Sequence, residues 1–266
     1  MMRFIAERVV ATSRQGRALA VHRFLSDCAR RLFPQPTVAF ATSLLGLATL
    51  AAAWYAWIWT ARPPREAISP DGLLMAVCLS AAVVAAYHYP IHVRRKIKVS
   101  LASIPLYLIA TLLPPPLAVT AGVIGVLVSE LSVRARRGTT MSTLLGGVWR
   151  WAPIILLAAL VVHAPATAAG RTIGLLAAGP IMAVGDYLTI PLVLAPLLHE
   201  RPLRVILPAV RDTYEIESIQ YTAGILGVLV VGQWPVALLL LAAPALVIHH
   251  TFRSVKRVQA RLAQFA

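Results

Sequence analysis

A soluble globular fold does not fit this 266-residue chain, of which 59% is apolar and only 13% is charged. Outside the apolar runs, no segment could form a soluble domain of about 50 residues. The formal net charge of +15 does not indicate a nucleic-acid partner, because the basic residues flank apolar runs instead of lining one face. The sequence therefore predicts an all-α, polytopic helical bundle in the inner (plasma) membrane of the cell.

The first segment, residues 1–36, predicts a basic amphipathic helix on the membrane surface. It contains seven Arg and two acids, and its apolar residues fall on one helical face. Such a helix would contact membrane lipids, in particular anionic lipid at the cytoplasmic face. A solvated basic helix is the alternative. A cleaved secretory signal does not fit, because the first long apolar run begins only at Thr37.

Residues 37–251 predict a bundle of about eight spans, within a range of six to eight. A bilayer core about 30 Å thick takes about 20 helical residues, or fewer when basic side chains flank the run. The runs are 37–60, 72–87, 99–113, 117–133, 144–162, 172–198, 219–231 and 236–251. Residues 252–266 then predict a basic cytoplasmic helix.

The stretch 88–137 predicts a membrane hairpin with both ends on one side. Two apolar runs lie head to tail and are closed at both ends by Arg and Lys. Pro114, Pro115 and Pro116 remove three backbone donors and forbid a continuous helix between the runs. The turn should therefore lie where water can satisfy the freed carbonyl groups.

The distribution of basic residues predicts that both termini are cytoplasmic. With eight spans, the inner segments hold 22 of the 25 Lys and Arg residues, if Arg150 is counted in the connection before the fifth span. The outer side holds only Arg62, Arg65 and Arg171. Inner loops of membrane proteins carry such an excess of Lys and Arg.

The sixth predicted span, 172–198, contains several Gly and Pro residues and Asp186 at its middle, so we expect a kinked, internal helix. A carboxylate at membrane depth is costly and marks a polar site by default. Asp186, Tyr187 and Thr189 are the candidate ligand-binding cluster. The alternative is a protonated or locally paired Asp186 that stabilises the kink.

Four other polar residues are interpreted as interfacial: His88, His92, Glu130 and Glu215. Pro90 separates the two His residues and should prevent them from sharing one helical face, so no metal site is predicted. No catalytic motif is present, and neither Cys has an evident partner. We expect no enzymatic activity and no cofactor.

Two stretches resemble the membrane-embedded N-terminal module of bacterial signalling proteins that precedes HD-GYP, GGDEF or GAF domains. They are HYPIHVRRKIKVSLASIPLYLIATLLPPPLAVTAGVIGVLVSEL and, more loosely, GQWPVALLLLAAPALVIHH. The short, Gly- and Pro-broken spans also resemble, more weakly, the substrate-binding membrane subunits of vitamin transporters. No HD-GYP or GGDEF-like run is present. The first resemblance thus implies a stand-alone relative, or a sequence that ends at the linker helix after Thr251.

These resemblances imply a non-enzymatic membrane module that senses or binds a small or lipidic ligand and signals to a cytoplasmic partner. A cytoplasmic effector or a second copy of the chain would be the partner. The alternatives are the substrate-binding membrane subunit of a transporter and a structural subunit of a larger membrane complex.

Overall fold

The computed structural model describes residues 36–60, 69–88, 91–94, 97–137, 140–198 and 202–233. The elements are α2 Pro36–Thr60, α3 Pro70–His88, β1 Ile91–Arg94, β2 Ile97–Val99, α4 Ser103–Leu112, α5 Pro115–Arg137, α6 Met141–Trp149, α7 Trp151–His163, α8 Ala168–Leu198 and α9 Pro202–Gln233. The surface helix predicted over 1–36, except its last residue, lies outside the described residues, as do the span 236–251 and the tail helix 252–266.

The helical membrane architecture is confirmed. Among the described residues, five segments are long and apolar enough to cross a membrane: Ala39–Trp59, Pro70–His88, Pro115–Arg134, Met141–His163 and Ala168–Ile190. The chain is thus a multi-pass helical membrane protein. Its described part also contains one element that the all-α prediction missed, an antiparallel hairpin of β1 and β2.

Proline sets the start of several helices. Pro36, Pro70, Pro115 and Pro202 are the first residues of α2, α3, α5 and α9, where the missing N–H has no intrahelical acceptor to lose. Pro208 lies inside α9, six residues after its start.

The first arm of the predicted hairpin is shorter than expected. The run 99–113 was predicted as a span, but α4 has 10 residues and is about 15 Å long, half the thickness of a bilayer core. It is buried along most of its length. Ser80 donates to the carbonyl of Ala121, and Val83 faces Gly125, so α3 and α5 run in the same direction. The chain must therefore turn back between them, as the hairpin prediction requires.

The predicted fifth span is divided into α6 and α7, which meet at Arg150; Arg150 keeps α-helical backbone angles, and its N–H bonds to the Gly146 carbonyl. Pro153 lies four residues after Trp149, and its ring occupies the place of the N–H that would bond to the Trp149 carbonyl. The helix therefore ends at Trp149 and restarts at Trp151. By contrast, α8 is helical without a break through Pro180 and Pro191.

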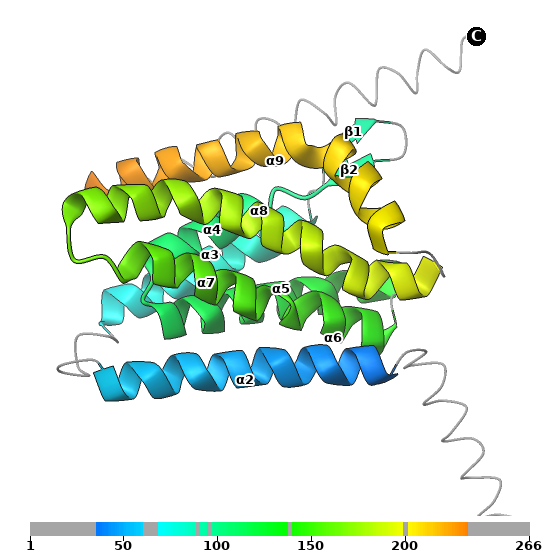
Figure 1. Ribbon diagram of the computed structural model, residues 1–266, viewed down its shortest axis with the longest axis horizontal. Coiled ribbons are helices and arrows are strands. Elements are labelled where there is room, and N and C mark those ends of the chain that lie inside the picture. Colours follow the sequence, from blue (N-terminus) through cyan, green and yellow to red (C-terminus); the bar gives the residue numbers. More distant parts are fainter. Residues whose placement is uncertain are drawn as a thin grey trace, which may run out of the picture.

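The centre of the bundle is formed by α4, α5 and α7, with α2 (blue) and α9 (orange) at opposite edges (Figure 1). Tyr107 of α4 is fully buried and donates to the Leu175 carbonyl of α8 at 2.6 Å. Its ring meets Tyr221 of α9 edge-on. The expectation that 172–198 is internal is wrong, because only 22% of the apolar window of α8 is buried, against 61% for α5.

The glycines of α8 let it approach its neighbours closely. A Cβ atom at Gly174 would overlap the Val161 carbonyl of α7, and one at Gly185 would lie 2.9 Å from Ile154. Gly179 faces Tyr221 of α9. Close approach through small residues is the main source of helix association in membranes, where lipid is as apolar as the side chains.

We expect Gly174→Ala to destabilise the bundle relative to Gly147→Ala. Both changes add the same intrinsic helix propensity, but a Cβ at Gly147 has no atom within 4 Å, whereas one at Gly174 meets backbone. The difference should be about 1–3 kcal/mol, measured by unfolding in detergent. Equal stability of the two variants would contradict the packing of α8 on α7.

Candidate functional site

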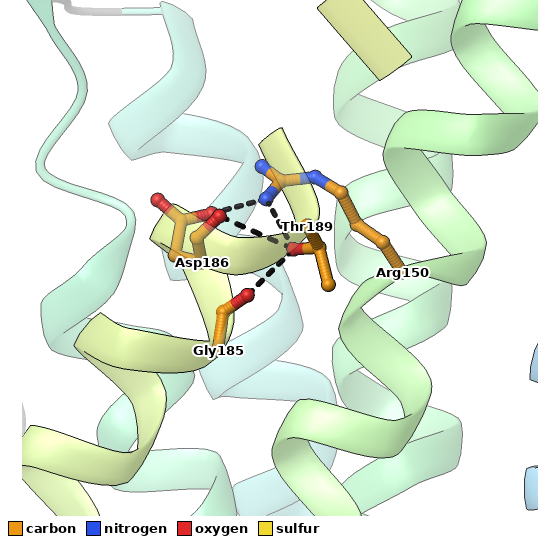
Figure 2. A network of polar contacts seen from close by, with 4 residues as sticks. All are labelled: Arg150, Gly185, Asp186 and Thr189. Atoms are coloured by element: carbon orange, nitrogen blue, oxygen red, sulfur yellow. Dashed lines mark hydrogen bonds and ion pairs between the residues drawn. The ribbon is translucent and has the colours of Figure 1, made fainter. Parts of the chain in front are cut away.

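An ion pair inside the membrane bundle joins the broken helix to α8. Arg150, at the junction of α6 and α7, donates through Nη1 to Oδ1 of Asp186 (Figure 2). Both side chains are shielded, with 15% and 13% of their surface exposed. Arg150 lies nine residues, about 14 Å along the axis, after Met141, the first residue of the candidate span Met141–His163. The sequence analysis counted it in the connection before that span.

Two further contacts fix the guanidinium. Arg150 Nη1 also donates to Thr189 Oγ1 at 3.2 Å, and that hydroxyl donates to the Gly185 carbonyl at 2.7 Å (Figure 2). The Arg150 guanidinium carbon lies 5.0 Å from the centre of the Trp151 ring, in cation–π range. An isolated charge in a low-dielectric interior is costly, and a pair with added hydrogen bonds offsets that cost.

The candidate cluster Asp186, Tyr187 and Thr189 divides into two groups. Asp186 and Thr189 both bind Arg150, as residues three apart on one face can. Tyr187 lies about 100° further round α8 and shares a 3.1 Å hydrogen bond with Thr213 of α9. Asp186 is paired, as the alternative interpretation expected. The partner is not local, however, because Arg150 lies 36 residues away in the sequence.

The polar zone continues onto α9 through two residues that the sequence interpretation did not single out. Glu217 interacts with Tyr187 and lies within electrostatic reach of Asp186 and Arg150. Gln220 is 2% exposed. Glu217 could have been identified from the sequence by its position two residues before an apolar run. Nothing in the local sequence distinguishes Gln220 from a lipid-facing or solvated residue.

The four interfacial candidates do not converge on this zone as a group. His88 is exposed at the end of α3, with Nδ1 2.9 Å from the Val84 carbonyl. His92 lies in β1, and its side chain is outside the described residues. Glu130 is partly buried on α5 within electrostatic reach of Arg150. Glu215 is exposed and accepts from the Tyr214 hydroxyl at 3.1 Å.

The residues described contain no group of three or more His, Cys, Asp or Glu side chains that could hold a metal ion. Comparison of the chain with family models, with curated proteins and with solved structures finds no match. The class that the fold and the polar zone define is a multi-pass helical membrane protein with a charge pair in its bundle.

We expect Arg150 and Asp186 to be energetically coupled. Arg150→Met or Asp186→Leu alone should destabilise the protein by about 3–5 kcal/mol, because each leaves a buried charge without its partner. The double variant should be more stable than the sum of the two losses predicts. Arg211→Met, at an exposed position of α9, is the control and should change stability by less than about 0.5 kcal/mol. Additive losses in the double variant would contradict the pairing.

Proposed function

We propose that this protein is a non-enzymatic membrane module that binds a small or lipidic ligand within its bundle and passes a conformational change to a cytoplasmic partner. The observation that supports it is the Arg150–Asp186 pair at the break between α6 and α7. Ionisable groups at membrane depth are costly and usually serve ion or ligand pathways.

The route from the site to the cytoplasm would be α9. This helix has 32 residues and is about 48 Å long, so it extends beyond a bilayer core. It faces Tyr187 through Thr213 and packs on Tyr107 through Gly224. If the protein had two conformations that differ in the position of α9, a ligand that bound one of them more tightly would shift the equilibrium towards it. The resemblance to membrane modules of bacterial signalling proteins is part of this proposal.

One observation favours the substrate-binding subunit of a transporter as a second candidate. The short, buried α4 turns into α5 at the prolines, and α6 and α7 meet at Arg150 beside the charge pair. Interrupted helices that line a site form the substrate sites of many transporters. In that function the partner would be a separate energising subunit.

The test is purification of the full chain from native membranes in mild detergent, followed by mass spectrometry of everything retained. The proposed function predicts a stoichiometric small molecule or lipid, together with a second copy or a cytoplasmic effector. A stoichiometric ATPase would instead favour the transporter. A protein that retains neither ligand nor partner, and that binds no candidate ligand when challenged, would contradict both functions.

We further propose that both termini are cytoplasmic. With Arg150 assigned to the bundle, the inner segments still hold 21 of the 25 Lys and Arg residues. A reporter that is active only outside the cell should therefore give no signal when fused after Ala266. The same reporter placed in the outer connection beside Arg171 should be active. A strong signal from the Ala266 fusion would overturn this topology.

A further inference from the structure

Glu217 and Gln220, on the buried face of α9, carry three polar atoms without a hydrogen-bond partner among the residues described, and Tyr221 Oη is a fourth such atom on this helix. The three are Glu217 Oε2, Gln220 Oε1 and Gln220 Nε2. Gln220 follows Glu217 by three residues, so the two share a helix face, and Gln220 is 98% enclosed. An unsatisfied buried polar group costs about 1–3 kcal/mol. A side chain that bears two such atoms indicates an absent binding partner.

Among the described side chains, the charges around these atoms do not balance. Arg150 is the basic group that acts on Glu217 there, and Asp186 already binds its Nη1 atom. Glu217 is thus a second carboxylate that shares one guanidinium, and Glu130 adds negative potential at Arg150 from α5. Ionised together, Arg150, Asp186 and Glu217 sum to one negative charge. A neutral ligand or a water molecule could bond to Gln220 but would leave that charge uncompensated.

We propose that this face of α9 binds a protonated amine that carries a neighbouring oxygen acceptor. The ammonium group donates to Glu217 Oε2 and Gln220 Oε1, and the ligand oxygen accepts from Gln220 Nε2. All three unpartnered atoms are then satisfied, and the excess negative charge is neutralised. A free amino alcohol and the ethanolamine headgroup of a phospholipid share this chemistry. The inference rests on the ligand-binding function proposed above and names its ligand class.

The experiment uses the full chain and two probes. Ethanolamine, which is protonated at pH 7, is titrated into protein in detergent, with ethylene glycol as a neutral control of similar size. In the second arm, the protein is reconstituted into vesicles of phosphatidylcholine alone or of phosphatidylcholine mixed with phosphatidylethanolamine. The readout is the thermal midpoint followed by Trp fluorescence. Ethanolamine should raise it in a saturable manner if the ligand is soluble, and phosphatidylethanolamine should raise it if the ligand is a lipid.

The matched variants are Glu217→Gln and Glu215→Gln. They remove the same charge from the same helix, but Glu215 is exposed and accepts from Tyr214. Glu217→Gln should weaken the response to the amine by about tenfold or more in apparent affinity, while Glu215→Gln keeps it. If Glu217→Gln does not fold, Gln220→Leu takes its place with the same expected loss.

Two results would overturn the inference. One is an unchanged amine response in Glu217→Gln or Gln220→Leu. The other is a wild-type protein that responds to neither ethanolamine nor phosphatidylethanolamine. If the mass-spectrometry experiment then finds a retained ligand of different chemistry, the proposed ligand-binding function still holds. Failure of the amine inference can thus be distinguished from failure of the proposed function.

Discussion

The Arg150–Asp186 pair constrains the arrangement of the helices around it. Arg150 lies where α6 ends and α7 begins, and Asp186 lies on α8. Neither side chain can turn towards lipid without exposing an ion to hydrocarbon. The rotation of α8 about its axis is therefore fixed, with Gly174 and Gly185 against α7 and Tyr187 directed to α9. Loss of the pair would therefore remove the contact between Arg150 and Asp186 and would also allow α8 to rotate about its axis.

In this bundle, prolines that interrupt helical hydrogen bonding lie close to buried polar side chains. Pro153 lacks the N–H that would bond to the Trp149 carbonyl, and Trp149 directly precedes Arg150. The same reasoning applies to the prolines between α4 and α5. A short, fully enclosed α4 is tolerated there because α5, α7 and α9 surround it, and Tyr107 ties it to α8.

The helix α9 differs from the others in its balance of polar and apolar residues. One face packs Tyr221 and Gly224 against Tyr107, whereas Glu217 and Gln220 bring polar atoms without partners to the same side. In the proposed function, the bound ligand satisfies these atoms, and α9 links the ligand site to the cytoplasm because the helix is long enough to leave the bundle.

The sequence by itself determined the membrane class and the location of five apolar spans. These features follow from local properties of the sequence: hydropathy, proline positions and the bias of Lys and Arg. Such properties do not depend on which helices pack together. The sequence also indicated the hairpin at Pro114, because three missing donors forbid a continuous helix wherever it packs.

Only the tertiary structure decided that Asp186 pairs with Arg150, that α8 is peripheral and that Gln220 is enclosed. These features depend on the level and rotation at which helices distant in sequence meet. Such placement results from the packing of Gly174 on Val161 and of Tyr221 on Gly179. No local pattern encodes it, because an Arg ten residues into an apolar run can pair inside the bundle or extend towards the interface.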